Sequence, residues 1–192
     1  FLGSFPLMLG GSINRRLLIP VYRDRPPSES RGNFIKLRRL RTTFTSCIIA
    51  LIGISAFFGP WLVEFLYDDR YRSAGVIVVL VACFSIPQAI GMTYDAAALA
   101  VGDSRAFFLL TAARAMLTTI GLVVGVSIGG LVGALVGQFL ATLLVYPGLI
   151  WLSARLGAWD MLHDAVFASL GALIFVTALW RSWQEIALLA IG

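Results

Sequence analysis

Five long apolar stretches follow one another along this chain, separated by short polar loops. They run approximately over residues 42–66, 73–101, 106–128, 131–154 and 165–180. A helix needs about 20 predominantly apolar residues to cross a bilayer, and four of the five stretches reach that length. Helices in soluble cores are seldom so long and so apolar throughout. The pattern predicts an all-α fold, built as a polytopic bundle of transmembrane helices.

Composition supports a membrane protein over a large soluble helical one. Charged residues make up 13% of the chain, against about 25% in a soluble domain. Because the chain does not begin with Met, we expect a piece from the C-terminal part of a longer protein. Residues 1–20, closed by Pro20, then end one partial span, and residues 183–192 begin a truncated one. We expect about six spans in a single transmembrane domain over residues 1–192.

Positive charge is concentrated in one loop. Nine of the 15 Lys and Arg residues lie between residues 15 and 41, namely Arg15, Arg16, Arg23, Arg25, Arg31, Lys36, Arg38, Arg39 and Arg41. Short loops rich in Lys and Arg stay on the cytoplasmic side of the cytoplasmic membrane. If successive spans then cross the membrane in alternate directions, eleven Lys and Arg residues lie inside. Three lie outside, two of them in residues 67–72 and the third at Arg181, and Arg114 falls within a span.

This basic loop at residues 15–41 allows two interpretations. In the first, it determines topology and contacts anionic lipid headgroups. In the second, it forms a cytoplasmic collar that attracts a phosphate-bearing substrate. Neither a nucleic-acid-binding fold nor interleaved aromatic residues accompany the charge, so a nucleic-acid partner is not expected.

Motifs for covalent or metal chemistry are missing from the sequence. Cys47 and Cys83 lie in apolar stretches, where cysteine usually acts as a small buried hydrophobe, and His163 stands alone in an expected loop. The glycines at 129–133 precede no Lys-Ser or Lys-Thr pair, so they do not form a phosphate-binding loop. We therefore expect no catalytic residue, no metal site and no cofactor, and we do not expect an enzyme.

Glycines recur at intervals of four across the third and fourth apolar stretches. They are Gly121, Gly125, Gly129, Gly133 and Gly137. Small residues at this spacing let two helices in a membrane approach closely. The spacing predicts a tight helical hairpin that turns at Gly129 and Gly130; the alternative is ordinary glycine content of membrane helices. In both cases the role is packing.

Two ionisable residues lie inside the apolar stretches. Asp95 precedes Gly102 by seven residues, and Arg114 follows Arg105 by nine. At about 1.5 Å per residue, both lie roughly 10–14 Å deep, counted from one shared turn. Because a charge facing lipid is costly, such residues usually pair or face a wet cavity. An Asp95–Arg114 pair would either lock two helices together or line a cavity.

Prolines interrupt several of the stretches, and Pro87 precedes the most polar segment in any of them. Gln88, Tyr94 and Asp95 follow it closely. Kinked helices that carry polar groups often line the wet cavity of a transporter. The alternative is that these groups form hydrogen bonds between helices.

Five short segments follow one another in a distinctive order. They are Leu18-Ile19-Pro20 before the basic loop, FGPWLVEFLY at 58–67, YRSA at 71–74, ALAVGDSR at 98–105 and GLVGA at 130–134. Together they resemble the polysaccharide (O-antigen type) flippases of the multidrug/oligosaccharidyl-lipid/polysaccharide exporter superfamily. The resemblance covers most of residues 20–155.

The resemblance implies a multi-pass transporter of two lobes that rock around a central cavity, of which this chain is most of the second lobe. It implies a lipid-linked oligosaccharide precursor of a surface polysaccharide such as lipopolysaccharide O-antigen as substrate, with membrane lipids and envelope polysaccharide synthesis proteins as partners. Cationic residues line such cavities and meet the substrate's pyrophosphate. The substrate-cavity candidates are thus Arg114, Asp95, Gln88, Tyr94, Arg15 and Arg16.

Two other functions stay open. A drug/ion antiporter of the same superfamily would carry acidic rather than basic groups in its cavity, so Asp95 without a paired Arg114 would favour it. A membrane-embedded glycosyltransferase or acyltransferase of envelope biosynthesis would need a polar catalytic loop. Residues 155–164, with one histidine, are a meagre candidate for such a loop.

Overall fold

The structure of this protein is a computed structural model, which describes residues 2–66 and 72–191. Helices are the only regular elements in these two ranges, so the expected all-α fold is confirmed for them. The elements are α1 (Phe5–Asp24), α2 (Arg31–Leu66), α3 (Arg72–Phe84), α4 (Ile86–Val101), α5 (Ser104–Arg155), α6 (Met161–Arg181) and α7 (Trp183–Ile191). The loop expected outside, at residues 67–72, lies almost wholly outside the described residues.

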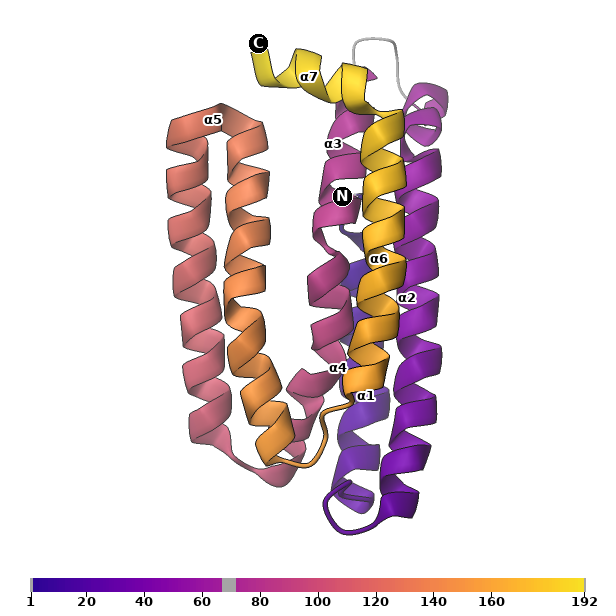
Figure 1. Ribbon diagram of the computed structural model, residues 1–192, viewed down its shortest axis with the longest axis vertical. Helices are drawn as coiled ribbons and strands as arrows, with labels where there is room; N and C mark the ends of the chain where they lie inside the picture. The colour runs from indigo at the N-terminus through magenta and orange to yellow at the C-terminus, as the bar shows by residue number, and fades with distance from the viewer. Residues whose placement is uncertain (1, 67–71, 192) are drawn as a thin grey trace.

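Three of the helices, α2, α5 and α6, are long and apolar enough to cross a membrane. A fourth crossing is obtained if α3 and α4, which meet at an angle of 43°, count as one bent span. These lengths support a membrane protein. Helix α5 itself turns back at Gly129 and Gly130, whose backbone is not helical, and forms two antiparallel limbs at residues 104–128 and 131–155 (Figure 1).

The other helices pack into a bundle beside the α5 hairpin (Figure 1). Its main core contains buried apolar side chains of α2, α3, α4 and α6, including Ile49, Ile52, Val79 and Phe167. Helix α1 is tied to α4 by the buried Asn14, whose side-chain amide donates to the Met92 carbonyl oxygen at 2.7 Å. Because the core lies within the bundle, most of the α5 surface stays exposed, as expected of a surface that faces lipid.

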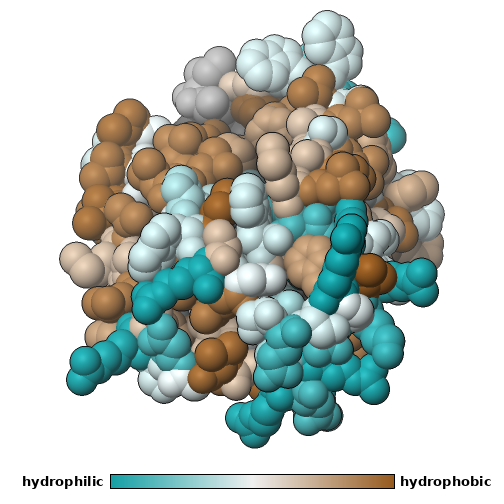
Figure 2. Space-filling model, turned by 60° about the horizontal axis from the view of Figure 1, so that its bottom comes forward, coloured by the Kyte–Doolittle hydropathy of each residue, from teal (hydrophilic) through white to brown (hydrophobic). Residues whose placement is uncertain are grey.

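Three loops gather at one end of the molecule, which we call the basic end. They are the α1–α2 loop, the turn between α4 and α5, and the α5–α6 loop (Figure 1). Figure 2, turned so that this end comes forward, shows hydrophilic side chains collected there and hydrophobic ones beyond them. Helix α7 lies across the opposite end (Figure 1).

Two helix boundaries differ from those expected. Pro20 does not end the first helix, because α1 continues to Asp24. A proline removes one backbone hydrogen bond, and burial of both Leu18 and Tyr22 holds the helix on either side of it. Helix α2 begins at Arg31 and runs for 36 residues. At about 1.5 Å per residue it is roughly 54 Å long. Most of the expected basic loop is therefore helical, because residues 15–24 belong to α1 and residues 31–41 continue into the apolar span as one helix.

The stretch at 73–101 is divided as the proline suggested. Helix α3 ends at Phe84, α4 begins at Ile86, and Pro87 occupies the first turn of α4. The Ser85 hydroxyl between them donates to the Ala82 carbonyl oxygen at 2.7 Å. Proline is well tolerated in the first turn of a helix because its missing N–H has no partner there. The break therefore costs little, and it redirects the polar segment that follows.

Candidate functional site

An ion pair joins α4 to the first limb of α5. Arg114 donates from Nη1 to Asp95 Oδ2 at 2.9 Å and from Nη2 to Asp95 Oδ1 at 3.0 Å. This two-pronged geometry is the strongest that a guanidinium and a carboxylate can form. The side chains remain 32% and 23% exposed, so the pair is not sealed inside the protein and one side of each group faces open space.

That open space is a polar recess between α4 and the two limbs of α5, with a volume of about 150 Å³. Seven side chains with polar groups line it, namely Gln88, Asp95, Arg114, Thr118, Gln138, Thr142 and Tyr146. Since a water molecule occupies about 30 Å³ in the liquid, the recess holds roughly five waters or one small polar group. A phosphate group fits this size, whereas an oligosaccharide does not.

The structure separates the six substrate-cavity candidates. Asp95, Arg114 and Gln88 line the polar recess. Tyr94 does not line it; this side chain is 3% exposed and points to another side of α4, toward α6. Arg15 and Arg16 are exposed on α1 and do not line the recess either.

The glycine-rich stripe lies between the two limbs of α5. A Cβ atom added at Gly125 would collide with the Gly133 carbonyl oxygen, and one added at Gly121 would collide with the Gly137 carbonyl oxygen. Gly129 lies at the turn and has open space around it. The four glycines of the two facing pairs therefore bring the limb backbones into direct contact, and this contact positions Arg114 and Gln138 on neighbouring limbs of the recess.

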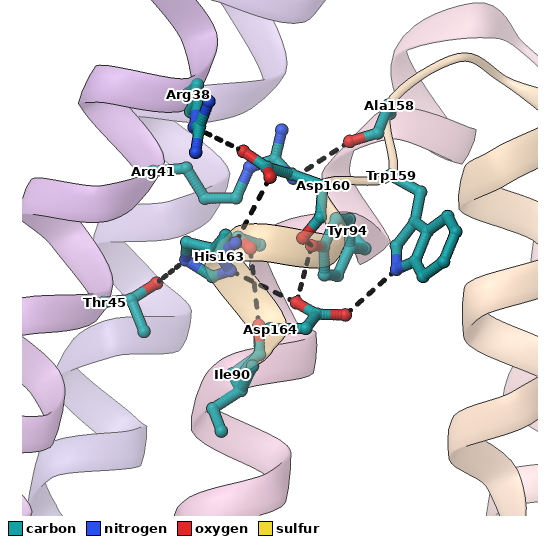
Figure 3. Close-up of polar contacts among 11 residues, drawn as sticks. Arg38, Arg41, Thr45, Ile90, Tyr94, Ala158, Trp159, Asp160, His163 and Asp164 are labelled. Atoms are coloured by element: carbon teal, nitrogen blue, oxygen red, sulfur yellow. Dashed lines mark hydrogen bonds and ion pairs between the residues drawn. The ribbon is translucent and has the colours of Figure 1, made fainter. Parts of the chain in front are cut away.

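A second group of polar residues lies near the basic end, inside the bundle (Figure 3). We call it the buried polar network; it comprises Arg38, Arg41, Thr45, Tyr94, Trp159, Asp160, His163 and Asp164. Asp164 is its central acceptor. Its carboxylate receives hydrogen bonds from Tyr94 Oη at 2.6 Å and from Trp159 Nε1 at 3.1 Å, and His163 Nδ1 lies 3.2 Å away.

Two arginines of α2 attach to the α5–α6 loop. Arg38 Nε lies 2.8 Å from Asp160 Oδ2, and Asp160 Oδ1 also accepts from the His163 backbone N–H at 3.2 Å, which caps α6. Arg41 is fully buried, donates from Nη1 to the Ala158 carbonyl oxygen at 2.9 Å, and lies 4.7 Å from the centre of the Tyr94 ring. The loop is thus held to α2 by charge-assisted contacts and a cation–π contact.

Tyr22 of α1 completes the surroundings of Arg41. Burial raises the pKa of the Tyr22 phenol, and the positive charge of Arg41 opposes this shift without cancelling it. The phenol is consequently neutral at physiological pH. It does not balance the charge of Arg41, which is stabilised by the Ala158 carbonyl oxygen and the face of Tyr94.

Sequence reasoning missed this network. His163 was expected to stand alone in a loop, and this expectation is wrong: it lies in the first turn of α6, 3% exposed, with Nε2 3.1 Å from Thr45 Oγ1. One signal was present, because Arg38, Arg41 and Thr45 recur every three or four residues along one face of α2. A polar face on a membrane helix indicates a polar partner inside the bundle.

Thr45, His163 and Asp164 form a hydroxyl–imidazole–carboxylate chain, which is the order found in hydrolase triads. A nucleophile must reach its substrate, however, and Thr45 is fully buried. Neither Thr45 nor His163 lines the polar recess. The geometry therefore favours a structural role, in which the chain of hydrogen bonds docks α6 on α2.

An apolar groove of about 610 Å³ lies next to the polar recess, between α4, the second limb of α5, and α6. Cys83, Phe139, Ala168 and Phe175 are among its lining residues. The groove and the polar recess share Pro87 and Tyr146 as a common wall. The polar recess and the apolar groove are thus adjacent, and both lie between the apolar helices.

Comparisons of this chain with protein-family models, with curated proteins and with solved structures find no match. Among the described residues, no three His, Cys, Asp or Glu side chains are grouped so that they could hold a metal ion.

Proposed function

We propose that the protein belongs to a transporter that moves a lipid-linked oligosaccharide precursor across the cytoplasmic membrane, and that it forms most of one of two lobes. About six spans, the first and last incomplete, contribute to this lobe. Arg114 in the polar recess is the observation that carries the proposal. It presents a guanidinium at membrane depth, in a space that is open and large enough for a phosphate group.

The physical problem of such a transporter is desolvation. A sugar phosphate that loses its water in hydrocarbon pays several kcal/mol for each unpaired polar group. The recess supplies substitute partners, since Gln88, Gln138 and Thr142 surround Arg114. In this proposal the substrate's phosphate displaces Asp95 from Arg114, and the oligosaccharide extends from the recess into a cavity shared with the other lobe.

The neighbouring apolar groove suits the hydrocarbon tail of the same substrate. It has about four times the volume of the recess, 610 against 150 Å³. Because Asp95 is paired with Arg114, the recess lacks the unpaired acidic group that is expected in the cavity of a drug/ion antiporter. No covalent step is needed, so the buried network has no catalytic task in this proposal.

Arg114→Ala tests the substrate role. Export of the surface polysaccharide is expected to fall at least about tenfold, with the protein level near that of the wild type, because the cation that meets the phosphate is lost. Arg114→Lys should retain part of the export, since the charge survives but the two-pronged geometry does not. Each variant is introduced at the native locus, and cell-surface polysaccharide is measured with protein level.

Arg181→Ala serves as the matched control, because Arg181 is exposed at the end of α6, opposite the basic end; its export should equal the wild type. The charge swap Asp95→Arg with Arg114→Asp separates substrate binding from helix locking. If Arg114→Ala loses export because its protein level falls, and the swap restores both, the pair serves to lock the helices. Normal export by Arg114→Ala at normal protein level would exclude the phosphate role.

The basic end is proposed to face the cytoplasm. In a background with Cys47→Ser and Cys83→Ala, Ser28→Cys in the α1–α2 loop should react with a membrane-impermeant maleimide only after the cells are opened. Gln184→Cys on α7 should react in intact cells, since both native side chains are exposed at opposite ends of the bundle. Labelling of Ser28→Cys in intact cells would reverse the orientation.

A further inference from the structure

A separate pocket of about 400 Å³ lies between the two limbs of α5 at their basic end. Its lining includes Arg105, Leu109, Leu110, Gly148, Trp151 and Arg155. None of them lines the polar recess or the apolar groove. The pocket therefore has no part in the transport site proposed above, and its occupant must be argued from its own chemistry.

Two cations form the rim of this pocket. Arg105 is the second residue of α5 and Arg155 is the last, and the hairpin brings them together because its limbs are antiparallel. Among the described residues, no carboxylate lies within ion-pair distance of either guanidinium. The Asp103 carboxylate is directed to the helix start, where Oδ1 accepts from the Ala106 N–H at 3.1 Å. The rim is consequently positive and open to an anion.

Below the rim, the pocket is apolar and faces outward. Leu109 is 66% exposed and Trp151 is 62% exposed. Gly148 leaves room between the limbs, since a Cβ atom added there would lie 3.5 Å from the Leu110 side chain. The Arg155 guanidinium lies 5.8 Å from the centre of the Trp151 ring. Tryptophan and arginine side by side are typical of the boundary between headgroups and hydrocarbon.

We infer that this pocket binds an anionic glycerophospholipid from the leaflet at the basic end. The phosphate lies between Arg105 and Arg155, and one acyl chain runs over Leu109 and Leu110 beside Gly148. Basic pockets between membrane helices bind anionic headgroups in this way. A free phosphate ion could use the two cations but would leave the apolar floor uncovered, so the lipid is the better match. The bound lipid bridges the limbs where the glycine contacts no longer reach.

Lipid binding to the purified protein in detergent tests this inference. The probes are phosphatidylglycerol, phosphatidylcholine with identical chains, and soluble glycerol 3-phosphate, followed by native mass spectrometry and by thermal melting. Phosphatidylglycerol is expected to bind and to raise the melting temperature. Phosphatidylcholine should bind more weakly, and glycerol 3-phosphate should neither bind detectably nor compete. Equal binding of both lipids would overturn the inference, and competition by glycerol 3-phosphate would assign the cations to a free phosphate.

Two variants locate the site. Arg105→Gln with Arg155→Gln should lower the affinity for phosphatidylglycerol about 10- to 30-fold, as expected for two cations near a headgroup. The control, Arg23→Gln with Arg25→Gln, removes the same charge from exposed positions at the same end and should keep the affinity. Gly148→Leu should weaken binding while every charge remains. This variant tests the pocket independently if the double arginine variant folds poorly. An equal loss in the control, or wild-type affinity in Gly148→Leu, contradicts the proposed pocket.

Discussion

Replacing Asp164 with leucine is expected to lower the free energy of unfolding by about 3–5 kcal/mol. The change leaves Tyr94 Oη, Trp159 Nε1 and His163 Nδ1 without their shared acceptor. Each buried donor that loses its partner costs about 1–3 kcal/mol, although Tyr94 retains a longer contact of 3.3 Å to the Asp160 carbonyl oxygen. For a chain of this size, the melting temperature should fall by roughly 6–20 °C.

Thermal melting of the purified protein in detergent measures this effect. Asp164→Asn keeps an oxygen acceptor and the side-chain shape, so it should recover about half of the loss. Glu29→Leu, which replaces an exposed carboxylate in the α1–α2 loop, should melt within about 1 °C of the wild type. If Asp164→Leu melts like Glu29→Leu, the buried polar network does not hold α6 in place.

Replacing Gly133 with leucine should also have a large effect, through a different cause. A side chain at Gly133 would occupy the position of the Gly125 carbonyl oxygen on the other limb of α5. Backbone cannot rotate away as a flexible side chain can, so the limbs must separate. Overpacking of a tight contact costs typically 1–3 kcal/mol and sometimes more, and we expect a cost of about 3 kcal/mol or above.

The readouts are folded yield after size-exclusion chromatography and the melting temperature. Gly129→Leu is the matched control because it places the same side chain in the same hairpin, at a position with open space. Gly125→Leu should behave like Gly133→Leu, since the two glycines face each other. Wild-type yield and melting for both Gly125→Leu and Gly133→Leu would show that the stripe faces lipid instead of packing.

Part of the candidate recess could be predicted from the sequence, because counting residues from the loop between α4 and α5 gives the depth of Asp95 and Arg114 along their helices. Asp95 lies seven residues before Gly102 and Arg114 lies nine residues after Arg105, and consecutive antiparallel helices place such residues side by side. The remaining wall could not be anticipated in the same way. Gln138 and Thr142 come from the second limb of α5, and only the geometry of the hairpin directs them toward Arg114.

Hydropathy determined by itself that this chain is helical and where most of its apolar helices run, because about 20 apolar residues suffice to commit a segment to membrane depth. Hydropathy is averaged over a helix, however, and does not report which face meets which neighbour. Tyr94 and Asp95 illustrate this: adjacent in sequence, they point about 100° apart around α4 and enter separate sites. Only the tertiary structure could join His163 to Thr45, 118 positions away, since lateral helix contacts decide where buried polar groups find partners.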